Sequence, residues 1–159
     1  MMLERLKNDM KIAMKAREKE RLGVIRSIQA ELKNVGIDKK GNEGLTAEVS
    51  SPAEYLDEGE ILAVLRSMVK KRKDSADAYQ KGGRDDLVQI ELFEVEVIQT
   101  YLPQPLSELE VEALAKEAIA DLGAQGMSDM GKVIKACQVK AAGRADGKVL
   151  AGIVRQLLA

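Results

Sequence analysis

The amino-acid sequence predicts an all-α protein. Apolar residues recur at the 3.6-residue helical period in nearly every segment, whereas the alternation typical of strands is hard to find. Glycines and prolines stand between these segments, where the chain must turn. The 159 residues are 45% hydrophobic and 32% charged, an ordinary balance for a soluble protein with a modest core.

Residues 1–102 are expected to form an N-terminal helical domain of about four helices. The first helix carries an apolar stripe over residues 3–14, and the second carries one over residues 22–35. Glycine, serine and proline are frequent over residues 36–52, which predicts a loop there.

The third and fourth helices complete the N-terminal domain. Asp57 and Glu60 have the spacing of a capping box at the start of the third helix, which the glycines at 82–83 end. The fourth helix is expected from about Asp85 to Tyr101. It stops there because residues that precede a proline avoid helical dihedrals, and both Pro103 and the proline two residues later impose that restriction. The stretch YLPQP is therefore the predicted domain boundary.

Residues 103–159 are expected to form a small C-terminal three-helix domain. Ser107 and Glu110 form a second capping box, and a glycine at 123 ends that helix. Ser128 is positioned to cap the next helix, and Gly143 to end it in the left-handed conformation. Asp146 is positioned to cap the last helix, so the segment GRADG is predicted to be a corner between two helices.

Several residue types are scarce, which argues against catalysis. The chain has no histidine, so the commonest general base and a common metal ligand are missing. The single cysteine, Cys137, lies on an apolar stripe and is expected to be a reduced core residue. Four aromatic residues are too few to tile a surface with base-stacking platforms. We expect no catalytic residue, no metal site and no cofactor.

No run of residues approaches the roughly 20 apolar residues that span a bilayer. The first 20 residues are charged throughout and lack the apolar stretch of a signal peptide. We therefore expect a cytoplasmic protein without a membrane partner.

Charge is distributed unevenly along the chain, although the net charge is only −1. Residues 1–22 hold seven Lys/Arg against four Asp/Glu, whereas residues 102–122 hold one lysine against five acids. From residue 123 onward six cations face two acids, which predicts a basic patch able to attract phosphate backbones. The run KKRK at 70–73 is followed by two aspartates within a helical turn, and we interpret it as a solvated helix face.

The two glycines of GRADG do not make a nucleotide-binding loop. Both the Walker motif and the dinucleotide fingerprint require a preceding strand, and none is predicted. A helix-turn-helix fits the spacing better, but the front of its second helix, GKVLAG, is poor in base-reading side chains. The GK pairs at 131–132 and 147–148 lie in first helical turns, where backbone N–H groups favour anions, so both lysines are plausible phosphate contacts.

Four blocks of sequence resemble the GatB/YqeY family, and specifically its stand-alone YqeY-like proteins. They begin with MLERL at Met2, KKRKDSADAYQKGGRDDL at Lys70, VIQTYLPQPLSELE at Val97 and MSDMGKVIKACQVKAAGRADGKVLAGIVRQLL at Met127. The resemblance covers essentially the whole chain, with residues 46–55 as a small insertion or variable loop.

The resemblance implies an all-α protein whose two domains correspond to the C-terminal helical and tail domains of GatB, a component of the glutamine-dependent aspartyl/glutamyl-tRNA amidotransferase. In GatB the tail domain helps to hold the tRNA body. The ATP-using domain of GatB has no counterpart here. The family label of a carbon–nitrogen ligase with glutamine as amido-N-donor therefore does not rest on residues of this chain.

These observations lead to a hypothesis of a non-catalytic helper that binds tRNA or another structured RNA through its C-terminal domain. The predicted RNA contacts are Lys132, Lys135, Lys140, Arg144 and Lys148. The predicted structural motif is Gly131, Gly143, Asp146 and Gly147. Two alternatives remain: an adaptor that docks on an amidotransferase or aminoacyl-tRNA synthetase, and an accessory role in glutamine-dependent amidation.

Overall fold

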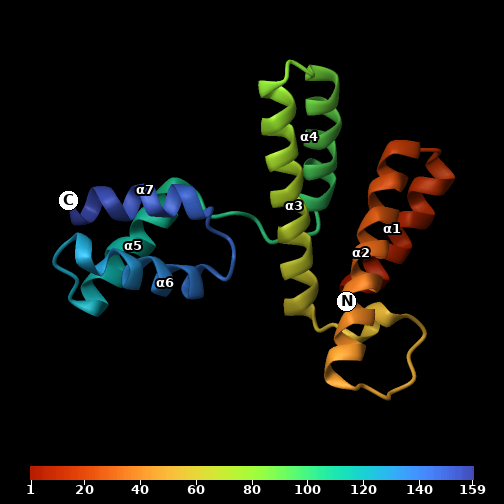
Figure 1. Ribbon diagram of the computed structural model, residues 1–159, viewed down its shortest axis with the longest axis horizontal. Coiled ribbons are helices and arrows are strands. Elements are labelled where there is room, and N and C mark those ends of the chain that lie inside the picture. The colour runs from red at the N-terminus through yellow and green to blue at the C-terminus, as the bar shows by residue number, and fades with distance from the viewer. The chain divides into compact units, whose positions relative to one another are not determined.

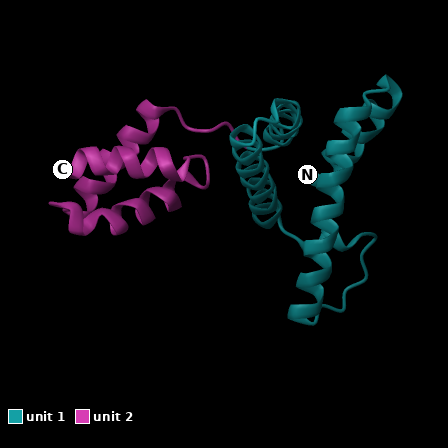
Figure 2. Cartoon of the chain, turned by 45° about the horizontal axis from the view of Figure 1, so that its top comes forward, with its two compact units in different colours: residues 1–102 teal, residues 103–159 magenta.

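The computed structural model describes residues 1–159 and consists of α-helices, two short 3-10 helices and no strand, which confirms the all-α class (Figure 1). The chain divides into two compact units, Met1–Leu102 and Pro103–Ala159, which are coloured separately in Figure 2. Each unit encloses a hydrophobic core of its own.

The N-terminal unit is built from two antiparallel helical hairpins and one short helix. Its elements are α1 (Met2–Ala16), α2 (Lys19–Glu43), the 3-10 helix η1 (Pro52–Tyr55), α3 (Glu58–Lys81) and α4 (Asp85–Gln99). Arg17, in the left-handed conformation with φ 59°, ends α1 and begins the reversal into α2. The predicted capping box at α3 is present, because Asp57 accepts from the Glu60 amide and Glu60 accepts from the Asp57 amide.

The second helix is longer than the sequence indicated, so the predicted loop over residues 36–52 is wrong in its first part. Helix α2 continues through Gly36 and Gly41 and ends at Glu43. Gly36 is buried where η1 crosses the helix, and a Cβ at this position would lie 2.0 Å from the Pro52 carbonyl oxygen. This glycine is therefore required by close packing and not by a turn.

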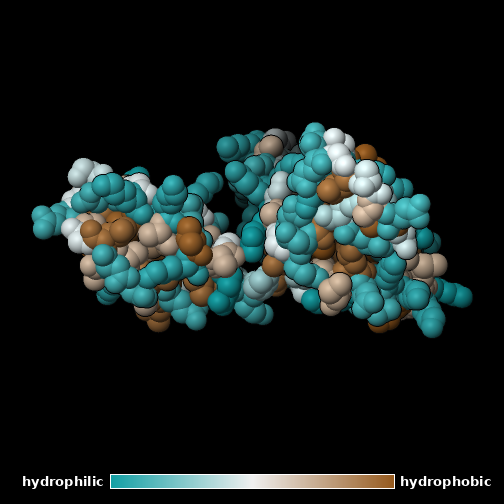
Figure 3. Space-filling view, turned by 90° about the horizontal axis from the view of Figure 1, so that it is seen from below, coloured by the Kyte–Doolittle hydropathy of each residue, from teal (hydrophilic) through white to brown (hydrophobic).

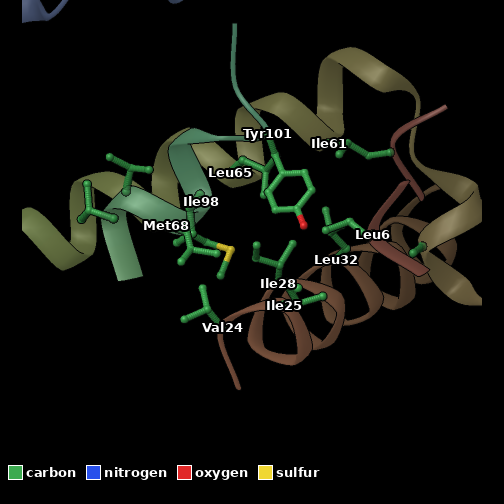
Figure 4. Close-up of a cluster of buried hydrophobic side chains, with 14 of the residues drawn as sticks. Leu6, Val24, Ile25, Ile28, Leu32, Ile61, Leu65, Met68, Ile98 and Tyr101 are labelled. Carbon is green, nitrogen blue, oxygen red and sulfur yellow. The ribbon is translucent and has the colours of Figure 1, made fainter. Parts of the chain in front are cut away.

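The core of the N-terminal unit lies between α2, α3 and α4, with α1 covering one side (Figure 4). Ile25, Ile28, Leu32, Leu65 and Ile98 are fully buried there. At the end of α4, Tyr101 inserts its ring into this core while its hydroxyl donates to Asp9 Oδ2 over 2.7 Å.

Arg5 closes the edge of this core. Its guanidinium carbon lies 4.7 Å from the centre of the Tyr101 ring, and its Nη2 donates to the Thr100 carbonyl over 2.9 Å. The first helix is thus tied to the last residues of the unit by groups 95 positions apart in sequence.

Tyr101 gives the stability of the N-terminal unit a defined pH dependence. Burial, and then the hydrogen bond to Asp9, raises the pKa of its phenol above the ordinary value of 10.0. The contribution of the neutral phenol is complete below about pH 10 and is lost as the pH rises through the folded-state pKa. We expect urea-measured stability to fall more steeply between about pH 9 and pH 11 in the wild type than in Tyr101→Phe. Parallel pH profiles would contradict this assignment.

Arg72 joins three helices from the middle of the KKRK run. Its Nε donates to Glu94 Oε2 of α4 over 2.5 Å, and its Nη2 donates to the Ser27 hydroxyl of α2 over 3.1 Å. The expectation that residues 70–73 form a solvated face is therefore wrong for Arg72, although Lys70 and Lys73 are exposed. Arg72 can reach both helices because α2 and α4 each pack against α3.

The C-terminal unit is a three-helix assembly of α5 (Glu108–Leu122), α6 (Met130–Ala141) and α7 (Gly147–Leu158), with the 3-10 helix η2 (Met127–Asp129) before α6. Each of the three helices packs on the other two. Ser107 and Glu110 form the predicted capping box at α5. The core residues are Val111, Ala115, Ala118, Val133, Cys137, Leu150, Val154 and Leu158.

Two predicted caps in this unit are corrected by the structure. Ser128 does not cap α6, because it lies within η2, and the Asp129 carboxylate instead accepts from the Gln125 amide over 3.1 Å. Gly143 is left-handed as predicted, with φ 79°, but the residue that ends α6 is Ala142, which is itself left-handed at φ 48°. The corner therefore contains two successive left-handed residues.

Candidate nucleic-acid interface

The predicted basic patch occupies only part of the C-terminal unit. Residues 103–159 hold seven Lys/Arg and seven Asp/Glu, so the unit is neutral as a whole. Five of the acids belong to α5, whereas α6, the corner and α7 hold six cations against one aspartate. Any attraction for phosphate must therefore come from surfaces of α6 and α7 that face away from α5.

Lys140 is neutralised by α5. Its Nζ lies 2.9 Å from Glu117 Oε1 and 3.0 Å from Asp121 Oδ2, and these hydrogen bonds raise the pKa of the lysine. The side chain thus bridges α6 and α5 within the unit. Its contacts indicate a structural role, and we leave it out of the interface proposed below.

Arg144 also has an internal role. Its Nε donates to the Gln104 carbonyl over 2.8 Å, and its own carbonyl accepts from the Leu106 amide over 2.8 Å. The corner therefore holds the segment that leads into α5. The bond to the Gln104 carbonyl uses only the Nε–H of the guanidinium group. Its four Nη–H donors stay available at the surface.

Asp146 caps α7 as predicted. Its Oδ1 accepts from the amides of Lys148 and Val149 over 2.9 and 3.1 Å. The expectation that this first turn offers free N–H groups to an anion is therefore corrected, because a carboxylate already occupies them. Gly147 and Gly131 lie in the first turns of α7 and α6, and the unit's own packing does not explain either residue, since an added Cβ would meet nothing within 4 Å.

Lys132 and Lys135 lie on the outer face of α6. The buried side of this helix is formed by Val133, Cys137 and Ala141. The two lysines are exposed on the opposite side. Neither side chain makes an ion pair or hydrogen bond. Val139 shares this face and is 75% exposed.

Lys148 and Arg155 form a second exposed pair, on the outer face of α7. They are separated by two helical turns, and neither side chain has an ionic or hydrogen-bonding partner. Arg155 is absent from the predicted contacts, although its spacing of seven residues from Lys148 is visible in the sequence. Of the predicted cations, Lys132, Lys135 and Lys148 are thus unpaired, whereas Lys140 on α6 and Arg144 at the corner are bonded within the unit.

Gly152 lies on the same exposed face, between Lys148 and Arg155. An added Cβ would meet nothing within 4 Å, so no packing contact in this unit requires glycine in the middle of α7. We expect Gly152→Ala to stabilise the C-terminal unit by about 0.5–1 kcal/mol, because alanine favours the helix by about that amount. Thermal unfolding of the variant measures this gain, and a loss of stability would show that the glycine has an internal role.

Other chemically active groups are sparse in the structure. Cys137 is fully buried, and burial raises the pKa of its thiol, which disfavours the reactive thiolate. No three acidic or thiol side chains converge in a way that could hold a metal ion. None of the helices combines the length and the apolar composition needed to cross a membrane.

Comparison with known proteins places these features in a family. A family model described as "Yqey-like protein" matches residues 3–158. The relatives named "Altered inheritance of mitochondria protein 41, mitochondrial" include one from Eremothecium gossypii, 35% identical over 76% of this chain and 58% of the relative. The one from Lachancea thermotolerans is 34% identical over 74% of this chain and 57% of the relative.

The protein of the same name from Pyrenophora tritici-repentis is 28% identical over 90% of this chain and 72% of its own length. The chain spans less than two thirds of the length of the first two relatives. The family model, in contrast, extends over both helical units and includes the α6–α7 corner. The chain therefore belongs to the YqeY-like protein family.

Proposed function

We propose that this protein binds structured RNA, with tRNA as the first candidate, through the outer faces of α6 and α7, and that it does so without catalysing a reaction. The observation that carries the proposal is the set of exposed cations without ionic partners on these two helices. They are Lys132, Lys135, Lys148 and Arg155. The resemblance to the tail domain of GatB gives the choice of tRNA.

The composition of the C-terminal unit favours contact with the phosphate backbone over reading of bases. The unit contains no aromatic residue, so it has no platform on which bases can stack. Lysine and arginine on smooth helical faces neutralise phosphates and recognise the shape of an RNA more than its sequence. The open surface at Gly152 leaves room for a backbone to approach α7 closely.

Charge reversal on α7 tests this interface directly. Lys148→Glu/Arg155→Glu is expected to weaken tRNA binding by about tenfold or more and to lower the salt slope by about 2, since each phosphate contact contributes about 1. This pair avoids Arg144, whose substitution would also disturb the corner. The matched control is Lys70→Glu/Lys73→Glu, which changes the net charge equally on exposed lysines of α3. Equal affinities of the two variants would overturn the proposed interface.

A protein–protein adaptor is the second candidate. On the first turn of α5, Leu109 is 79% exposed beside the acidic residues of that helix, and Val139 is similarly exposed on α6. An apolar contact of this kind predicts binding to an amidotransferase or synthetase that is nearly insensitive to salt. Weakening by Leu109→Ala, with Lys148→Glu/Arg155→Glu unchanged, would support the adaptor over the RNA binder.

For glutamine-dependent amidation, we propose that this chain alone has no activity. The chain has no histidine to act as a general base. Its one cysteine is buried, and burial raises the pKa of the thiol, which disfavours the nucleophilic thiolate. A glutaminase assay on the purified chain measures this, and any turnover by the wild type above a protein-free control would contradict the proposal. Cytoplasmic location likewise stays a prediction, which fluorescence microscopy of the tagged protein can test.

A further inference from the structure

The N-terminal unit carries a second group of cations, which the proposed function does not use. They lie on the first helical hairpin, formed by α1 and α2. We name this group the hairpin cation cluster: Lys7, Lys11, Lys15, Lys19, Arg26 and Lys33. All six side chains are exposed, and none makes an ion pair or hydrogen bond.

Helical spacing arranges these residues in two rows. On α1, Lys7, Lys11 and Lys15 are four residues apart, so they lie one above another on the same face of the helix. On α2, Lys19, Arg26 and Lys33 are separated by seven residues each, so they repeat every two turns and the row extends over about 21 Å.

The two rows border the same side of the hairpin. Lys7 and Lys33 both line a cleft of about 730 Å³, together with Gln29 and Ala30 of α2. Because α1 and α2 pack against each other along the hairpin, the two rows continue from this cleft toward the turn at Arg17. Figure 3 shows the mixture of hydrophilic and apolar surface from one side of the molecule.

Acidic residues are concentrated at the other end of this side. Glu4, Glu54, Asp57 and Glu58 line the cleft near the start of α3. Close to the turn, Glu18 is already paired with Arg21 over 3.2 Å. The positive charge is therefore strongest around Lys11, Lys15, Lys19 and Arg26.

Other lysines of the N-terminal unit stand in a different environment. Lys70 and Lys73 on α3 are followed within about one helical turn by Asp74 and Asp77, which offset their charge. Lys39 is bound to Glu60 over 2.7 Å. The hairpin cation cluster thus differs from Lys39 in being unpaired, and from Lys70 and Lys73 in extending over long rows on two helices.

We propose that the hairpin cation cluster is an additional binding surface for the phosphate backbone of structured RNA. This inference rests on the proposed function only for the class of ligand, since the surface belongs to a different unit. Rows of cations without neighbouring aromatic side chains complement a polyanion and provide no base readout. The residues between the α2 cations on this face, Gly23 and Ala30, are small and leave a phosphate backbone room to approach this row. On α1, Ile12 and Met14 are about half exposed beside the lysines, so binding to anionic vesicles is measured as the competing outcome.

The test compares three double variants of the full chain that all change the net charge by the same amount. Lys11→Glu/Arg26→Glu reverses the charge of one cluster residue on each helix, Lys148→Glu/Arg155→Glu reverses the α7 pair, and Lys70→Glu/Lys73→Glu is the control. Fluorescence anisotropy with labelled tRNA is measured between about 50 and 200 mM salt, a range over which phosphate contacts strongly affect affinity. The neutral variant Lys11→Gln/Arg26→Gln replaces the cluster reversal if circular dichroism shows loss of helix.

We expect reversal of the cluster to raise Kd by about tenfold or more and to lower the salt slope by about 2, with the control unchanged. If only the α7 reversal weakens binding, the proposed function stands and the hairpin surface is overturned. If only the cluster reversal weakens binding, the hairpin surface stands and the α7 interface is overturned. Failure of the wild type to bind tRNA overturns both, and binding to phosphatidylserine vesicles in its place would assign the cluster to membranes.

Discussion

Replacing Gly36 with alanine is expected to destabilise the N-terminal unit by about 1–3 kcal/mol, the usual range for overpacking. The reason is the position of the backbone of η1. The added methyl carbon would lie 2.0 Å from the Pro52 carbonyl oxygen and 2.5 Å from its carbonyl carbon. Neither atom can rotate away, so either η1 must leave α2 or the helix must bend. Urea unfolding monitored by circular dichroism measures the loss.

The same substitution at Gly23 is the matched control. Gly23 lies in the same helix and is exposed, and a methyl group added there would meet nothing within 4 Å. Gly23→Ala should therefore stabilise the unit by about 0.5–1 kcal/mol through helix propensity alone. Opposite signs for the two variants support the packing role of Gly36, and a stabilising effect at both positions would refute it.

The second large effect is expected from Leu150→Ala in the C-terminal unit. Leu150 is fully buried on α7, and its truncation should cost about 2–5 kcal/mol, because it removes apolar contacts and leaves a cavity. A unit of this size has a total stability of only about 3–9 kcal/mol at the usual contribution per residue. The variant is therefore expected to lose most of the structure of residues 103–159 while the N-terminal unit stays folded.

Amide NMR spectra distinguish these outcomes, because resonances of the two units can be followed separately. Leu109→Ala is the control, since this leucine is 79% exposed and its truncation should change stability by less than about 0.5 kcal/mol. Loss of dispersion restricted to residues 103–159 is the expected result. Simultaneous unfolding of both units, or a fully dispersed spectrum of Leu150→Ala, would contradict it.

The features that the sequence predicted correctly depend on neighbours in the chain. Both capping boxes need only residues three apart, and the Asp146 cap needs only the next two or three amides. The helical stripes likewise depend on spacing alone, so the all-α class and the helices of each unit follow from the pattern.

The errors arise where distant residues determine the structure. Gly36 resembles a helix breaker until Pro52 is placed against it, and Arg72 resembles a solvated cation until Ser27 and Glu94 surround it. At the corner, Ala142 adopts the left-handed conformation one residue before Gly143, which spacing alone does not determine. These features require the packing of whole helices, which the local pattern does not contain.

The candidate interface shows the same division. The sequence locates the cations of α6 and α7, but it does not show that Lys140 pairs with Glu117 and Asp121, since that pairing depends on how α5 and α6 pack. It also does not show that Arg144 binds the Gln104 carbonyl. Arg155 and the α2 row of the hairpin cation cluster could have been found from their seven-residue spacing, and the α1 row from its four-residue spacing.

The central claim is that this protein holds structured RNA by its phosphates, and a salt titration of tRNA binding by the wild-type chain tests it most directly. Neutralisation of the four unpaired cations of α6 and α7 predicts that log Kd rises linearly with log salt, with a slope of about 3 or more. The slope should be larger still if the hairpin cation cluster also takes part. Binding whose Kd stays constant from about 50 to 200 mM salt, or no binding at the lower concentration, would contradict the claim.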